Sequence, residues 1–231
     1  MAPEVSWIWS NLDLILSLAV DHVRQSVIAI ILGLILSVPL GWVAWRYRLL
    51  RGWVITLTGL LYTIPSLALL VLLPSVAGYG IRTETNLIVG LTIYAVAIQT
   101  RSVADGFDSV DPAVRQAATA MGYGGFRRFW AVDLPLSGPV VLAGLRVMSV
   151  STVSLATVGI LVGVTNLGYL FTNGIQRRLL EEVFAGIVAV ALIALVIDAL
   201  LVLLGRLLMP WARTPAPGRA RRERRRAEAT A

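Results

Sequence analysis

Five long apolar runs constrain this chain more than any other feature of its sequence. A helix needs about 20 apolar residues to cross a hydrocarbon core about 30 Å thick, and most of the runs meet that requirement. The third run is shorter and spans the core once its polar flanks snorkel toward the headgroups. The runs are Val23 to Trp45, Trp53 to Leu73, Asn86 to Thr100, Ser137 to Leu161 and Val183 to Leu204. Because lipid satisfies no open backbone groups, we predict an all-α integral membrane protein with about five transmembrane helices.

Composition narrows the chemistry that such a chain can perform. Hydrophobic residues make up 57% of the chain and charged residues 14%, against about 45–50% and about 25% in soluble domains. Cysteine is absent and His22 is the single histidine, so we predict no metal site. All twenty basic residues are arginines, which leaves no lysine for a phosphate-binding P-loop. We therefore expect no enzymatic activity and no bound cofactor on this chain, and any ATP hydrolysis on another subunit.

The arginines also predict the orientation in the membrane. With the N-terminus outside, only Arg24, Arg82, Arg177 and Arg178 lie on the outer side. The cytoplasmic side then receives Arg46, Arg48, Arg51, Arg101, Arg115, Arg127, Arg128, Arg206, Arg213 and the arginines that follow. This asymmetry obeys the positive-inside rule and favours an odd number of spans. Two helices within Ser137 to Leu170 would instead give six spans and an external tail. The net charge of +7 thus reflects topology, and we expect no nucleic-acid partner.

Both ends of the chain are predicted to lie outside the bundle. The segment Trp7 to Val20 is too short to span, and its tryptophans are typical of the membrane interface. No basic n-region precedes it, so a cleaved signal peptide is not expected. The proline-rich and arginine-dense C-terminus is predicted to be disordered and to bind anionic lipid. These features divide the chain into an extracellular interfacial segment at 1–22, a membrane domain at 23–208 with a polar loop at 105–135, and a basic cytoplasmic tail at 209–231.

The polar loop contains a short amphipathic helix. Asp111 and Pro112 are typical of an N-cap followed by a first-turn proline, and Val114, Ala117, Ala118 and Met121 then recur with helical spacing. Gly122 is placed to end the helix, and a second short piece leads to Leu134 and Pro135. The pattern predicts a helix-turn-helix whose alanines allow another backbone to approach closely. An ordinary charged loop at the headgroups is the alternative.

The same residues resemble the EAA loop of ABC importer permeases, E-A-A-x3-G-x9-I-x-L-P. The matching residues are Gln116, Ala117, Ala118, Gly122, Val132, Leu134 and Pro135, and every spacing is kept. Gln116 replaces the glutamate of the pattern and Val132 its isoleucine. The chain most resembles the osmoprotectant uptake permeases from about Asp21 to Leu208, through "ILGLILSVPLGW", "IPSLALL", "LPLSGPVVLAGLR" and "LVIDALL". It departs from them after the fourth run, where "VGVTNLGYLF" stands in place of a glycine-rich stretch.

The resemblance implies a type I ABC importer permease fold with a cytoplasmic coupling helix, in a bacterial inner membrane. It implies ATP-binding subunits that hold ATP and Mg, a second permease copy or paralogue, and an extracellular substrate-binding protein as partners. The implied solutes are glycine betaine, carnitine and choline, with an amino acid-like solute as the alternative. A membrane scaffold and an ion-driven transporter with a proton site at Asp198 are the competing classes.

Further residues stand out within the apolar runs. Arg146 and Asp198 are placed at similar depths, where charged groups are costly unless paired, so an ion pair between helices is predicted. Tyr62 and Tyr94 are the mid-span aromatic residues able to face a cationic solute. Together with Pro65 and Ser66, at a proline-interrupted helix, they are candidates for the solute pathway. His22 is predicted to lie at the interface.

Overall fold

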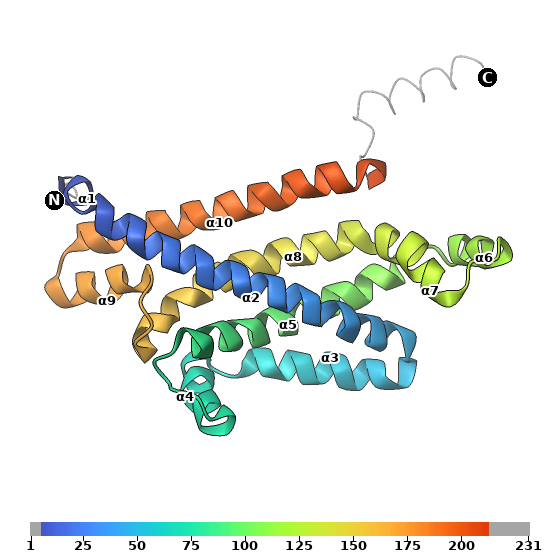
Figure 1. Cartoon of the computed structure of the whole chain (residues 1–231), viewed down its shortest axis with the longest axis horizontal. Helices are drawn as coiled ribbons and strands as arrows, with labels where there is room; N and C mark the ends of the chain where they lie inside the picture. The colour runs from blue at the N-terminus through green and yellow to red at the C-terminus, as the bar shows by residue number, and fades with distance from the viewer. Residues whose placement is uncertain (1–5, 213–231) are drawn as a thin grey trace, which may run out of the picture.

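The structure is a computed structural model that describes residues 6–212. Every regular element in this range is helical (Figure 1). The α-helices are α1 (Ser6–Ser10), α2 (Leu12–Arg46), α3 (Arg48–Thr63), α4 (Ser66–Ala77), α5 (Glu84–Asp108), α6 (Pro112–Ala120), α7 (Gly125–Arg128), α8 (Leu134–Ala156), α9 (Gly168–Arg177) and α10 (Leu180–Leu208). A π-helical turn at Phe129–Asp133 joins α7 to α8, and 3-10 turns follow α8 and α10 at Thr157–Val162 and Pro210–Ala212. The prediction of an all-α protein is confirmed.

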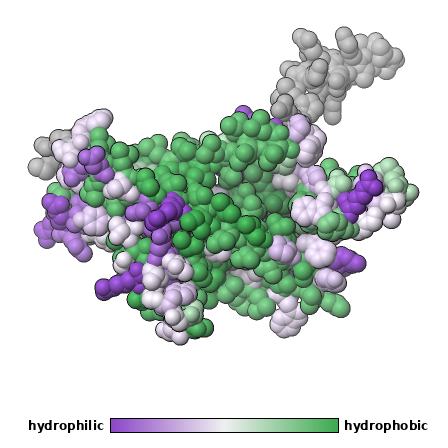
Figure 2. Space-filling model, in the orientation of Figure 1, coloured by the Kyte–Doolittle hydropathy of each residue, from purple (hydrophilic) through white to green (hydrophobic). Residues whose placement is uncertain are grey.

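The long helices lie side by side and form a bundle (Figure 1). Four helices are long and apolar enough to cross a membrane, and the bent pair α3 and α4 makes a fifth span if counted as one. The helices α1 and α9 lie at one end of the bundle, and α6 and α7 lie at the other. Apolar residues cover the middle of the visible surface, while hydrophilic residues gather toward its ends (Figure 2). This distribution suits a protein that crosses a bilayer along its long axis.

The predicted single helix from Trp53 to Leu73 is wrong, because the chain bends by 107° between α3 and α4. Pro65 lacks a backbone N–H and disfavours helical geometry at the preceding residue. Ile64 is accordingly extended, with φ −67° and ψ 128°. The Tyr94 hydroxyl donates a hydrogen bond to the freed Ile64 carbonyl, which satisfies one of the backbone groups that the bend exposes.

The first long helix also differs from prediction. It begins at Leu12 rather than near Val23, so residues 12–22 continue the first long helix and do not form a separate segment. His22 is fully buried, and its Nε2 lies 3.0 Å from the Val153 carbonyl oxygen of α8. The side chain of His22 therefore packs in the core of the bundle, against α8. The prediction made for residues 1–5 lies outside the described range, as does the predicted tail beyond Ala212.

The alternative with six spans finds no support in the helix pattern. The helix α8 runs unbroken from Leu134 to Ala156, and α9 has only 10 residues. A helix of that length rises about 15 Å, half of the hydrocarbon thickness. The helix α1 and the end of α10 therefore lie at opposite ends of the bundle (Figure 1).

The helix α5 lies at the centre and packs against α2, α3, α4 and α8. Small residues let α2 and α5 approach closely. A Cβ added at Gly33 would lie 2.4 Å from the Ala95 Cβ, and one added at Gly41 would lie 2.6 Å from the Val103 Cβ. Such small-residue contacts take the place of the hydrophobic driving force that lipid cannot supply between helices.

Gly41→Leu should therefore separate α2 from α5. Overpacking of this kind costs about 1–3 kcal/mol, and we expect a lower thermal unfolding temperature in detergent. Gly59→Leu is the matched control, because nothing lies within 4 Å of a Cβ added there. Equal unfolding temperatures for both variants would contradict the close packing of α2 and α5.

Candidate functional site

The loop that resembles the EAA motif folds as predicted, into α6 followed by a glycine turn. Asp111 caps the helix, because its Oδ1 accepts a hydrogen bond from the Ala113 N–H at 2.8 Å. Gly122 has φ +85°, a left-handed conformation that glycine adopts without strain. The N–H groups of Gly122 and Tyr123 donate to the carbonyls of Thr119 and Ala118 at 3.0 and 3.1 Å. These two bonds form a Schellman motif, which ends α6 and turns the chain toward α7.

The two alanines of the motif differ in exposure. Ala118 is 2% exposed and packs on the bundle, whereas Gln116 and Ala117 are exposed. Ala118 therefore packs within this chain, and Ala117 is the alanine of the motif that is accessible to a partner. One exposed face of α6 carries Ala113, Gln116, Ala117 and Ala120, which recur at helical spacing. Three of these four residues are alanines, so another backbone can approach this face closely.

A buried carboxylate holds α6 in place. Asp133 is 2% exposed and lies in the π-helical turn that precedes α8. Its Oδ1 accepts a hydrogen bond from Arg115 Nε of α6 at 2.8 Å, and its Oδ2 accepts one from Arg128 Nε of α7 at 3.3 Å. Arg128 also donates to the Thr119 hydroxyl at 3.1 Å. We call Asp133, Arg115 and Arg128 the Asp133 cluster; it joins α6, α7 and the base of α8.

Arg115 extends this cluster to two further helices. Its guanidinium donates to the Val110 carbonyl at 3.0 Å and also to the Phe107 carbonyl at the end of α5. The same group lies 4.7 Å from the centroid of the Trp45 ring of α2, a cation–π contact. Arg115 therefore fixes α6 against the ends of α2 and α5 as well as the start of α8.

Aromatic rings fill the space beneath the π-helical turn. Phe129 lies 5.7 Å from Phe107, 6.2 Å from Trp42 and 5.2 Å from Trp130, centroid to centroid. The remaining motif residues, Val132, Leu134 and Pro135, are half-buried along the same turn and the first residues of α8. The motif thus covers both the exposed helix and its attachment to the bundle.

Asp133 and Arg128 were not among the residues singled out from the sequence. The available signal was a single carboxylate, flanked by Val132 and Leu134, close to a run that contains Arg115, Arg127 and Arg128. A carboxylate in apolar surroundings requires a cationic partner. The identity of that partner depends on the turn at Gly122, which returns the chain toward α6.

The predicted intramembrane ion pair is present. Arg146 of α8 donates from Nε and Nη2 to the two carboxylate oxygens of Asp198 of α10, at 2.6 and 2.8 Å. The side chains are 43% and 25% exposed, and grooves between α8 and α10 adjoin the pair on both sides. The pair therefore bridges α8 and α10 at a partly exposed position.

The candidate pathway residues cluster at the bend between α3 and α4. The Tyr62 and Tyr94 rings lie 5.9 Å apart and are nearly perpendicular. Pro65 and Tyr62 are exposed, Ser66 is half-buried, and Tyr94 is 3% exposed. The two tyrosines contact each other and do not form an open cage within this chain, which leaves Tyr62 as the accessible ring.

The fold and the motif together define a class. The chain is a five-span helical bundle, and an EAA-like loop attaches a short helix to one end of it. This is the architecture of the membrane subunit of an ABC importer. Solved structures of ABC transporters share this fold. An inward-facing MetNI methionine ABC transporter matches with TM-score 0.70 and 19% identity over 88% of this chain and 99% of that chain. An amino acid ABC transporter matches with TM-score 0.73 and 16% identity over 89% of this chain and 99% of that chain.

This chain belongs to the family of binding-protein-dependent transport system inner membrane components, whose model matches residues 25–214. It is 33% identical over 190 residues to the glycine betaine/carnitine/choline transport system permease protein OpuCD of Bacillus subtilis (strain 168), covering 82% of each protein. It is 31% identical to the choline transport system permease protein OpuBB of the same strain, covering 82% of this chain and 86% of that protein. It is 29% identical to the osmoprotectant import permease protein OsmW of Salmonella typhimurium, covering 85% of this chain and 93% of that protein. The chain is thus a multi-pass membrane permease.

Asp133→Asn should loosen α6 from the bundle. Removing one partner of a buried ion pair costs about 3 kcal/mol, so amide hydrogen exchange in α6 should become on the order of 100-fold faster. Asp108→Asn is the matched control, since Asp108 is 46% exposed and pairs with Arg51 at the same end of the bundle. If α6 exchanged at the same rate in both variants, the Asp133 cluster would not hold it.

Proposed function

We propose that this chain is the permease subunit of an ATP-driven importer of quaternary-amine osmoprotectants, the class that contains glycine betaine, carnitine and choline. The relatives named above support this solute class, because their names specify these compounds and their similarity covers most of the chain. A quaternary ammonium ion is recognised by aromatic faces, and Tyr62 supplies an accessible ring at the bend between α3 and α4. An extracellular binding protein supplies the primary recognition of the solute.

ATP-binding subunits, which hold ATP and Mg, dock on the exposed face of α6. The face of Ala113, Gln116, Ala117 and Ala120 is exposed at the end of the bundle, and its small side chains permit close contact. Force applied there reaches α8 directly, because the Asp133 cluster joins the two helices. Gln116 offers hydrogen bonds to the partner in place of the carboxylate charge of the family pattern.

The N-terminus lies outside and α6 lies in the cytoplasm. Arg46, Arg48 and Arg51 are at the same end of the bundle as α6, which supports this orientation by the positive-inside rule. The binding protein then approaches the opposite end, where α1 and α9 lie (Figure 1). A second copy of this chain, or a related permease, completes the pathway, because five spans do not enclose a gated channel.

Uptake into proteoliposomes tests this function. The permease is reconstituted with its ATP-binding subunit and binding protein, and labelled glycine betaine, carnitine and choline are supplied outside. We expect accumulation with internal ATP and none with an ion gradient alone. Accumulation driven by the gradient, or accumulation of amino acids but not quaternary amines, would contradict the proposal.

Substitutions in the glycine turn test the role of α6 in the same assay. Gly122→Val should abolish uptake at normal protein level, because a β-branched residue does not tolerate φ +85°. Gly122→Asn should retain most uptake, since asparagine adopts left-handed conformations. Gly124→Val is a matched control, because Gly124 has φ −65° and open space around it. Equal uptake by the two valine variants would exclude a role for this turn.

A further inference from the structure

Two recesses adjoin each other on α2 near the end of the bundle that carries α6. The first, the apolar groove, has a volume of about 550 Å³ and is lined by Val38, Pro39, Trp42, Gly125, Phe126, Phe129 and Trp130. The second, the arginine recess, has a volume of about 560 Å³ and is lined by Trp45, Arg46, Arg48, Arg51, Asp108, Arg115 and Arg128. Their chemistry is opposite: one has only hydrophobic side chains, and the other is mainly cationic.

The two recesses form one continuous surface. Val38, Pro39, Trp42, Trp45 and Arg46 recur at helical spacing, so they share one face of α2. Trp42 and Arg46 are one turn apart, about 6 Å along the helix axis. On the opposite wall, Phe129 lines the apolar groove and its neighbour Arg128 lines the arginine recess. A ligand that follows α2 therefore passes from apolar to cationic surroundings within a few ångströms.

The charges of the arginine recess are only partly compensated. Arg115 and Arg128 are paired with Asp133, and Arg51 is paired with Asp105 and Asp108. Arg46 and Arg48 form no ion pair with any residue in the described range 6–212. Arg46 lies 5.6 Å from the centroid of the Tyr47 ring, and both arginines are exposed. The recess therefore has two cationic groups available for an anionic ligand.

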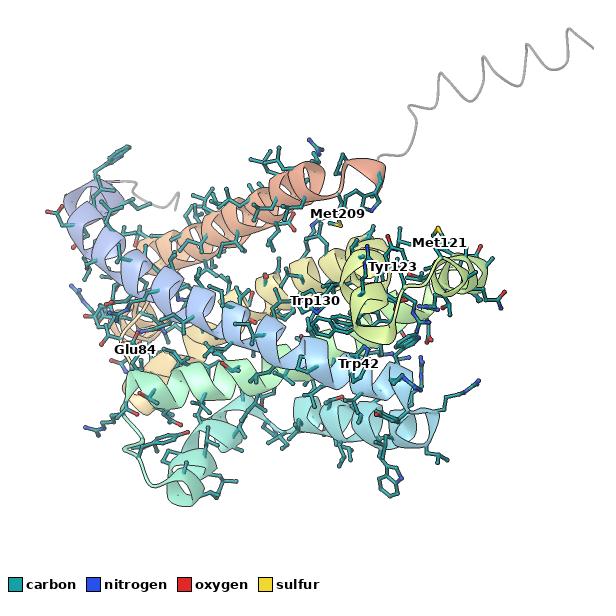
Figure 3. All side chains as sticks on the ribbon, turned by 45° about the vertical axis from the view of Figure 1, so that its right-hand side comes forward. Trp42, Glu84, Met121, Tyr123, Trp130 and Met209 are labelled. Carbon is teal, nitrogen blue, oxygen red and sulfur yellow. The ribbon has the colours of Figure 1, made fainter. Side chains whose placement is uncertain are left out.

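The height of this surface matches the membrane interface. Arg46 is the last residue of α2, and the apolar run that it ends is long enough to cross the hydrocarbon core. Trp42, one turn before Arg46, and Trp130 line the groove (Figure 3), and tryptophan is enriched at the membrane interface. The apolar groove thus lies at the depth of acyl chains, and the arginine recess lies at the depth of headgroups.

We propose that this combined surface binds one anionic phospholipid. Its phosphate would lie between Arg46 and Arg48, and an acyl chain would lie along Pro39, Trp42 and Phe129. An acidic water-soluble partner would leave the apolar groove uncovered, and an apolar helix of a second copy would leave Arg46 and Arg48 without an anion. A phospholipid satisfies both halves. Because Gly125 and Phe126 of α7 line the groove, the bound lipid also contacts the element that follows α6.

The test measures tryptophan quenching by brominated lipids in the full-length protein. Vesicles of phosphatidylcholine contain a small fraction of either brominated phosphatidylglycerol or brominated phosphatidylcholine, and bromine on the acyl chain quenches nearby tryptophans. We expect the phosphatidylglycerol form to quench more strongly at equal mole fraction. A Trp42→Phe/Trp130→Phe variant should lose most of this excess, since it removes the two tryptophans that line the groove.

Charge variants identify the headgroup site. Arg46→Gln/Arg48→Gln should lower the preference for phosphatidylglycerol about tenfold or more, and glutamine at these exposed positions leaves the packing of α2 intact. Arg101→Gln is the matched control, because Arg101 is 72% exposed at the same end and lines neither recess; it should keep the preference.

Three results would overturn the proposal. The first is equal quenching of the unmodified protein by the two brominated lipids. The second is the same loss of preference in Arg101→Gln, which would indicate a general charge effect. The third is an unchanged lipid preference in Arg46→Gln/Arg48→Gln together with weaker binding of the ATP-binding subunit, which would assign the recess to an acidic partner protein.

Discussion

The carboxylate of Asp133 holds α6 and α7 against the start of α8. A charge that is only 2% exposed persists only when cationic groups compensate it, and here Arg115 and Arg128 arrive from two different helices. The same arginines contact the ends of α2 and α5 and the side of α6. A nine-residue helix outside the membrane would otherwise be marginally stable. The cluster makes it a fixed extension of α8.

The bundle continues this connection through the membrane. The helix α8 begins at the Asp133 cluster and reaches α10 through the Arg146–Asp198 ion pair. Close contacts between small residues hold α2 and α5 together, and α5 also contacts α3, α4 and α8. The break at Ile64 and Pro65 is the main interruption among the described spans, and it places Tyr62 at an accessible bend.

The features that were predicted from sequence are those that local chemistry or the bilayer fixes. Hydrocarbon thickness determines the length of the five apolar runs, and Asp111 and Gly122 define the ends of α6. A charge in lipid requires a partner, which is why an ion pair between Arg146 and Asp198 was predicted. The features that were missed depend on distant contacts. The partner of His22 is a carbonyl 131 residues away, and the inward face of Ala118 depends on how α6 lies on the bundle. The bend at Pro65 could not be separated from a tolerated proline within a span.

The central claim is that an ATP-binding subunit docks on the exposed face of α6, and the absence of cysteine makes it directly testable. A photo-crosslinker attached to the single cysteine of Ala117→Cys should capture the ATP-binding subunit during turnover, whereas one at Ala118→Cys should not, because Ala118 is 2% exposed. Failure of position 117 to capture that subunit, or its labelling by an impermeant reagent from outside the cell, would contradict the account.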